Sequence, residues 1–295
     1  MPWTHRKAAT SRSESKAAGS WTEQEERRQP GALRRLCRRL AKDVLSAPLV
    51  IGFVTDAEIG RHYGVGASKK VALILKFRRN RKRVQTESQW QEHVELAAAL
   101  LRIPPTVHGD VIECGCFKGG SSVNLSIVCS LVGRRLVICD SFEGLPEPTS
   151  EERLHYSPFT GHYDHYERGR FSASLEEVEG NLTRYGRRDV CDFVIGYFDE
   201  SLPQVNGSYV MAFFDADLVE SLKPCLLHIW PNLSKGGRMY VHEARSLSLV
   251  SVFFDREWWH SSLLVEPPGF VGAGTGLPLL PVVGSELGFA AKADA

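Results

Sequence analysis

The fold class is decided by the stretch Val111-Ile112-Glu113-Cys114-Gly115-Cys116-Phe117-Lys118-Gly119-Gly120-Ser121. It begins as a short apolar strand over residues 110–114 and passes through glycines into a predicted helix over 121–132. Glycines at 115, 119 and 120 let the backbone turn sharply and approach a ligand closely. A second predicted strand, 135–140, ends in Asp140. Strand, loop, helix and strand in this order predict parallel strands joined by a crossover helix.

The same alternation continues along the chain. Further strands are expected over residues 190–197, 209–217 and 237–243, with helices over 174–185 and 220–230. We therefore predict an α/β fold: a doubly wound, mostly parallel, Rossmann-like sheet with helices on both faces. The Gly- and Pro-rich residues 267–284 are expected to add late antiparallel strands.

The chain before the sheet divides by composition. Residues 1–30 are polar and predict a disordered leader. Residues 31–105 predict a basic helical N-terminal extension, and residues 106–295 the main α/β domain. Within the extension, leucines at helical spacing among arginines predict a basic amphipathic helix over 33–45. A second helix is predicted over 90–101, where Pro104-Pro105 ends the pattern.

Overall composition narrows the function classes. The formal net charge is +1, so the protein carries no nucleic-acid signature, and no apolar run reaches the ~18 residues of a membrane span. Seven cysteines without CxxC spacing are typical of reduced core thiols rather than a disulfide framework. We expect a cytoplasmic protein, with the N-terminal helices as candidate elements of a homo-oligomer.

The glycine loop does not match a dinucleotide fingerprint. A dehydrogenase would carry GxGxxG, whereas this loop reads ExGxxxGxS with Glu113 at the strand end. A glutamate there would repel a pyrophosphate, but it suits a ligand with a cationic ammonium and sulfonium. Asp140 follows Gly119 by 21 residues (140 − 119), where a carboxylate can accept both hydroxyls of a ribose.

Acidic residues also close two later strands. Asp215 ends one strand and His242-Glu243 ends the next, so the three side chains are expected at one edge of the sheet. Three interpretations stay open: a divalent metal site that orients and activates a hydroxyl, His242 as a metal-free general base, or a structural hydrogen-bonded pair. A histidine ligand shifts preference from magnesium toward manganese, iron or zinc. Asp217 is expected to hold the loop or cap a helix.

Residues 146–171 form a long segment rich in aromatic and basic side chains. Segments of this length inside an α/β domain are usually lids or binding loops. We predict an acceptor lid, with an oligomer contact or a solvated loop as alternatives. Its rings and cations are Arg153, His155, Tyr156, His162, Tyr163, His165, Tyr166, Arg168 and Arg170.

Taken together, ExGxxxGxS and the acid closing the second strand resemble class I methyltransferases of the catechol O-methyltransferase type. The run Asp140-Ser141-Phe142-Glu143-Gly144-Leu145-Pro146 is similar to the macrocin O-methyltransferase family, which methylates sugar hydroxyls of antibiotics. Gly196-Tyr197-Phe198 and Asp215-Ala216-Asp217-Leu218 are similar too, so that the resemblance covers roughly residues 90–245. Related metal-dependent enzymes carry Asp-Asp or Asp-Asn where this chain has His242-Glu243.

The resemblance implies S-adenosylmethionine as cofactor, a divalent metal (Mg or Mn), and a sugar-like small-molecule acceptor. Glu113 and Gly115 would face the methionine part, Asp140 the ribose, and Tyr197-Phe198 the adenine. The implied cofactor site is Glu113, Gly115, Gly119, Ser121, Asp140, Ser141, Tyr197 and Phe198. Asp215 and His242 are the predicted catalytic side chains, and Asp215, His242 and Glu243 the predicted metal ligands.

Two other functions remain as alternatives. One is a metal-independent O-methyltransferase that acts on a phenolic or lipid-linked acceptor with His242 as base. The other is a catalytically silent S-adenosylmethionine-binding scaffold.

Overall fold

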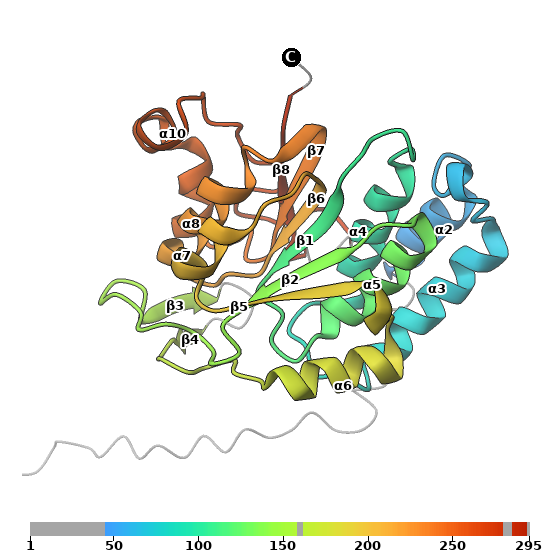
Figure 1. Cartoon of the computed structure of the whole chain (residues 1–295), viewed down its shortest axis with the longest axis horizontal. Coiled ribbons are helices and arrows are strands. Elements are labelled where there is room, and N and C mark those ends of the chain that lie inside the picture. Colours follow the sequence, from blue (N-terminus) through green and yellow to red (C-terminus); the bar gives the residue numbers. More distant parts are fainter. Residues whose placement is uncertain (1–44, 158–161, 280–284, 294–295) are drawn as a thin grey trace, which may run out of the picture. The chain divides into compact units, whose positions relative to one another are not determined.

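A computed structural model of the chain describes residues 45–157, 162–279 and 285–293, without the side chains of residues 155–164 (Figure 1). The described residues belong to one unit of the chain, residues 41–295. The predicted leader over 1–30 and nearly all of the predicted basic helix over 33–45 lie outside the described residues.

The predicted doubly wound sheet is confirmed. Six strands pair in the order β5-β2-β1-β6-β7-β8, and all neighbours are parallel except β7 and β8. The chain runs outward from β1 through β2 to β5, and then crosses back to place β6 and β7 on the other side of β1. The strands are β1 Asp110–Cys114, β2 Leu136–Asp140, β5 Cys191–Ile195, β6 Tyr209–Phe214, β7 Leu233–Val241 and β8 Gly288–Ala291.

Helices cover both faces of this sheet (Figure 1). One face packs against α2 to α6 and the other against α8 to α10, so the described part of the predicted N-terminal extension shares a core with the sheet. Every residue of the central strand β6 is buried, as expected for a parallel strand covered on both sides. The helices are α2 Ala47–Thr55, α3 Ala67–Asn80, α4 Trp90–Arg102, α5 Gly120–Val132, α6 Leu175–Tyr185, α7 Phe198–Ser201, α8 Val219–Ile229, α9 Leu247–Ser251 and α10 Arg256–Leu263.

Two strand predictions need correction. Strand β7 begins at Leu233 rather than at residue 237, because residues 234–237 form an irregularity inside the strand, where the pairing with β6 shifts register. Leu233 is buried and pairs with Tyr209 of β6, so the strand starts before this irregularity. The antiparallel strand β8 lies after the predicted stretch 267–284, whose described part, residues 267–279, contains only an isolated bridge at Val271.

The predicted lid segment contains an antiparallel hairpin of β3, Leu154–Ser157, and β4, His162–His165. Among the described residues, none of the helices is long and apolar enough to cross a membrane. The six cysteines among the described residues are free and buried, as expected for core thiols.

Candidate functional site

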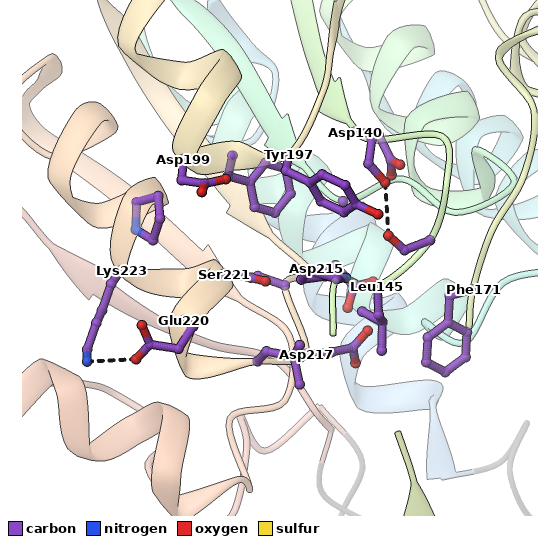
Figure 2. A pocket seen from close by; sticks show the side chains of 18 of the residues that line it. Asp140, Leu145, Phe171, Tyr197, Asp199, Asp215, Asp217, Glu220, Ser221 and Lys223 are labelled. Carbon is purple, nitrogen blue, oxygen red and sulfur yellow. Dashed lines mark hydrogen bonds and ion pairs between the residues drawn. The ribbon is translucent and has the colours of Figure 1, made fainter. Parts of the chain in front are cut away.

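A cavity of about 830 Å³ opens at the carboxyl ends of the parallel strands. Each strand end contributes to it, since side chains that follow β1, β2, β5, β6 and β7 all reach its wall. This is where a doubly wound sheet binds ligands, because the crossover connections diverge between β1 and β6. Figure 2 shows Asp140 and Tyr197 along one part of the wall, Asp215 and Asp217 near its centre, and Glu220 and Lys223 on another side.

Most residues of the predicted site meet at this cavity. Glu113 and Gly119 lie behind the lining: Glu113 is on buried β1, and Gly119 is the N-cap of α5. The lining members are Gly115, Ser121, Asp140, Ser141, Tyr197, Phe198, Asp215, His242 and Glu243.

The loop after β1 requires glycine at its first turn. Gly115 has φ +87°, and a Cβ atom there would lie 2.1 Å from the carbonyl oxygen of Asp215. Gly119 has φ +80° and starts α5, whose first N–H groups have no partners within the helix. The backbone therefore approaches the cavity closely and presents donors beside it.

Glu113 is the most unusual group near this loop. Its side chain is 0% exposed, and neither carboxylate oxygen has an aligned hydrogen-bond partner. Burial raises the pKa of Glu113 to about 8, and the charges of Asp215 and Asp140 add to the shift. The nearby Ser121 and Ser122 hydroxyls oppose this rise without cancelling it, so the buried carboxyl is costly to ionise unless it faces a cation. The residues of this loop thus fit a cationic cofactor such as S-adenosylmethionine.

Asp140 links the first two strand ends. One of its oxygens accepts a hydrogen bond from the Cys116 amide at 2.7 Å, and the other accepts from the Phe142 amide at 2.8 Å. Each oxygen retains a further lone pair for a ligand hydroxyl. Ser141 donates to the Gly144 carbonyl at 2.9 Å, so its hydroxyl also stabilises the turn that follows β2.

Acidic side chains gather on the β6 and β7 side of the cavity. Asp217 and Glu243 both adopt left-handed backbone conformations, with φ of 45° and 67°. Such strain in non-glycine residues concentrates at functional sites. Burial, followed by the charges of Asp215 and Glu243, raises the pKa of Asp217 well above its ordinary value. Asp217 is therefore a stronger base than an ordinary carboxylate.

His242 lies between carboxylates. Its Nδ1 is 3.3 Å from Asp215 Oδ1 and 3.5 Å from Glu243 Oε1, while its Nε2 is 3.5 Å from Glu92 Oε2. These are ion-pair distances, although neither ring nitrogen is aligned for a hydrogen bond. Burial lowers the pKa of His242, but the surrounding carboxylates outweigh burial and hold that pKa well above its usual value.

This environment bears on the interpretations of His242. A protonated ring has no lone pair for a metal and cannot take up a proton as a base. Within the ranges that the structure describes, no group of three or more His, Cys, Asp and Glu side chains forms a metal cluster. As arranged here, Asp215, His242 and Glu243 form an ion-paired cluster, and their role as metal ligands stays a prediction.

The predicted lid segment contributes aromatic and cationic groups to the cavity wall. Tyr166, Arg170 and Phe171 line the cavity, and the Arg170 guanidinium lies 4.7 Å from the centre of the Phe171 ring. The Tyr166 hydroxyl lies 3.4 Å from Asp217 Oδ1. The lid segment therefore reaches the acidic side of the cavity, next to the strained aspartate.

Comparison with known proteins matches residues 91–257 to one family, described as Macrocin-O-methyltransferase (TylF). That match covers more than half of the chain. The chain belongs to the macrocin O-methyltransferase family.

Two O-methyltransferases resemble this chain over a stretch shorter than the family match. The 8-demethyl-8-(2,3-dimethoxy-alpha-L-rhamnosyl)-tetracenomycin-C 4'-O-methyltransferase of Streptomyces olivaceus is 34% identical over 142 residues, 46% of this chain and 53% of that protein. The demethyldecarbamoylnovobiocin O-methyltransferase of Streptomyces niveus is 27% identical, with the same coverage of both chains. The chain thus matches about half the length of these relatives. The solved structure of the O-methyltransferase NovP is 17% identical with a TM-score of 0.49, covering 88% of this chain and 99% of that one.

At this site of the macrocin O-methyltransferase family member, two residues lie in environments that the sequence patterns did not predict. Glu92 lies in a helix whose spacing predicts a packing role, and no motif connects it to His242, 150 positions later (242 − 92). Asp217 was expected to support the loop, although its acidic neighbour Asp215 in the DADL motif was a signal of a functional position.

Proposed function

We propose that this chain is an S-adenosylmethionine-dependent O-methyltransferase that methylates a hydroxyl group of a sugar-like small molecule. Family membership supports the reaction class. The observation that carries the proposal is the fully buried carboxyl of Glu113, with its raised pKa, behind the Gly115 loop of a cavity that is also lined by the strained Asp217, whose pKa is raised as well. The first favours a cationic methyl donor, and the second supplies a base for the acceptor.

We assign the binding of the methyl donor to residues at the carboxyl ends of β1, β2 and β5. S-adenosylmethionine, when bound, supplies an electrophilic methyl group whose carbon–sulfur bond breaks with the electron pair leaving on sulfur. Asp140 has free lone pairs that can accept the ribose hydroxyls, and the Tyr197 and Phe198 rings line the wall where the adenine would lie. Glu113 would offset the positive charge of the donor.

On the acceptor side, we assign proton removal to Asp217. Its carboxylate would take the proton of the acceptor hydroxyl while the hydroxyl oxygen bonds to the methyl carbon. The raised pKa of Asp217 increases its affinity for the acceptor proton, and only the fraction of the protein in which Asp217 is deprotonated would react. Alignment of oxygen, carbon and sulfur would contribute a large part of the acceleration.

The remaining wall suits a polyhydroxylated acceptor. Glu220 and Lys223 form an ion pair at 3.0 Å beside the cavity, and the Trp258 ring lines it as well. Charged side chains can bind sugar hydroxyls, while an indole ring can pack against a sugar face. Both named relatives act on natural products, and the first name describes a rhamnosyl group, which supports a glycosylated acceptor.

The test is a transfer assay with rhamnosylated tetracenomycin and demethyldecarbamoylnovobiocin as acceptors. Mass spectrometry would follow both the methylated product and S-adenosylhomocysteine, and calorimetry would measure S-adenosylmethionine binding to wild type and Asp140→Ala. We expect product with a glycosylated acceptor and at least a tenfold weaker donor affinity in the variant, the effect of losing charge-assisted hydrogen bonds. Donor binding without product from any hydroxylated acceptor would favour the silent scaffold, and no donor binding would refute the proposal.

A further inference from the structure

Glu92 is a buried carboxylate on a helix that precedes the first strand of the sheet. It lies in the first turn of α4 and its side chain is 1% exposed. Burying an ionised carboxylate is costly unless other groups compensate for the lost water. Burial does raise the pKa of Glu92, but His242 and two backbone amides outweigh burial and bring that pKa below its usual value.

The compensating groups come from three separate parts of the fold. Glu92 Oε2 accepts a hydrogen bond from the Gln89 amide at 2.6 Å, which closes the capping box of α4. Glu92 Oε1 accepts from the Glu286 amide at 2.8 Å, in the segment that leads into β8. His242 Nε2 is the third group, 3.5 Å from Oε2. One carboxylate thus joins α4, the C-terminal segment and the end of β7.

The contact with His242 determines which edge of the ring faces the cavity. With Nε2 turned toward Glu92, Nδ1 is turned toward Asp215 and Glu243. The ring is 3% exposed, so water cannot substitute for either carboxylate partner. A carboxylate behind a functional histidine fixes the orientation of the ring in this way in many enzymes.

We propose that Glu92 is a positioning residue, which holds the His242 ring so that its Nδ1 edge orders Asp215 and Glu243 at the acceptor side of the cavity. Without Glu92, the ring could turn and the two carboxylates would lose a fixed partner. The effect on methyl transfer rests on the proposed function, whereas the effect on ring orientation does not depend on it.

The experiment must distinguish this positioning role from a purely structural role of Glu92 in capping α4. Glu92→Gln keeps the size of the side chain but removes its charge and one of its two acceptor oxygens. Gln89→Ala disrupts the other half of the same capping box and leaves the Glu92–His242 contact in place. Glu95→Gln is a second control, because Glu95 also reaches β7 from α4, through the Tyr240 hydroxyl at 3.1 Å, but does not contact His242.

The experiment measures the ring nitrogens of His242 by NMR in protein labelled with ¹⁵N-histidine, with the signals assigned by their loss in His242→Asn. We expect wild type, Gln89→Ala and Glu95→Gln to share one pattern with a protonated Nε2, and Glu92→Gln to shift or broaden it. In the transfer assay, Glu92→Gln should lower kcat by about 10- to 100-fold and leave the dissociation constant of S-adenosylmethionine within about twofold.

Several outcomes would overturn the inference. Unchanged His242 ring signals in Glu92→Gln would show that Glu92 does not position the ring. Equal changes in Gln89→Ala would reduce Glu92 to a helix cap. Absence of methyl transfer in wild type would instead count against the proposed function, and the ring signals would still decide the role of Glu92.

Discussion

Gly115 and Asp215, which directly follow the adjacent strands β1 and β6, lie so close together that only glycine fits at position 115. A Cβ atom on Gly115 would lie 2.1 Å from the Asp215 carbonyl oxygen, far inside van der Waals contact. The Asp215 amide is at the same time bonded to the Cys114 carbonyl at 2.9 Å, so neither backbone can move away freely. The loop after β1, which we propose binds the methyl donor, is therefore held against the acidic side of the cavity.

Gly115→Ala should damage both stability and donor binding. The added methyl group must displace the Asp215 backbone, and alanine also disfavours φ of +87°. We expect Tm to fall by about 5 °C or more and the affinity for S-adenosylmethionine to fall at least tenfold, measured by calorimetry. The matched control is Gly180→Ala in α6, where a Cβ atom would meet nothing within 4 Å and should be neutral or stabilising. A Gly115→Ala protein with unchanged Tm and donor affinity would contradict the steric account.

Donor binding should depend on pH through Glu113. Its pKa is raised to about 8 in the ligand-free protein, so below pH 8 a cationic donor must displace a proton from the carboxyl. We expect the affinity for S-adenosylmethionine to fall by roughly tenfold per pH unit below pH 8, with about one proton released at pH 7. Calorimetry in buffers of different ionisation enthalpy measures both. Glu113→Gln should abolish the proton release, and release that persists in this variant would assign it to another group.

The same carboxyl should affect the stability of the ligand-free protein. Its pKa is about 8 in the folded protein and near 4.5 in an unfolded chain, so the folded state binds the extra proton between these values. The stabilising contribution is therefore complete below about pH 4.5 and is lost as the pH rises through 8. Relative to Glu113→Gln, wild type should lose free energy of unfolding between pH 5 and pH 9 in urea titrations. A constant difference across this range would argue against a raised pKa.

Asp217→Asn should separate catalysis from stability. Loss of the base should lower kcat by about 10²- to 10⁴-fold, with the donor dissociation constant within about threefold. Because burial and the charges of Asp215 and Glu243 already favour the neutral form of Asp217, the neutral asparagine should leave Tm the same or raise it. Scanning calorimetry and the transfer assay measure the two effects. Glu200→Gln, which changes an exposed carboxylate elsewhere on the cavity wall, is the control for a general charge effect. A comparable loss of kcat in both variants would remove Asp217 from the role of base.

Chelation tests the predicted metal site. Because His242 is ion-paired on both edges, we expect EDTA to leave the rate of methyl transfer within about twofold and manganese to bind weakly at most. Electron paramagnetic resonance of added Mn²⁺ measures the binding directly. Stoichiometric Mn²⁺ binding that Asp215→Asn abolishes, together with a rate that EDTA removes and Mn²⁺ restores, would reinstate the metal interpretation.

Local pattern in the sequence was sufficient for the parallel strands and for the cofactor loop. The apolar run before Glu113 and the glycines after it encode a strand and a tight turn within eleven residues, and Asp140 closes the next strand at a typical distance. Strands and tight turns depend on contacts between residues that are close in the chain. The regular alternation of strands and helices also appears in the sequence as a periodic pattern of apolar residues. The family motif DSFEGLP extended this reading to the reaction class.

Tertiary packing alone decided the environment of the acidic residues. The pairing of Glu92 with His242, the crowding of Asp217 by Asp215 and Glu243, and the closeness of Gly115 to Asp215 join residues that are distant in the chain or differ in strand. No periodic pattern in the local sequence predicts such pairs, because a glutamate in a helix looks the same in the sequence whether its side chain faces water or a buried imidazole. Burial sets the cost of each charge, and only the folded chain determines which charges are buried together.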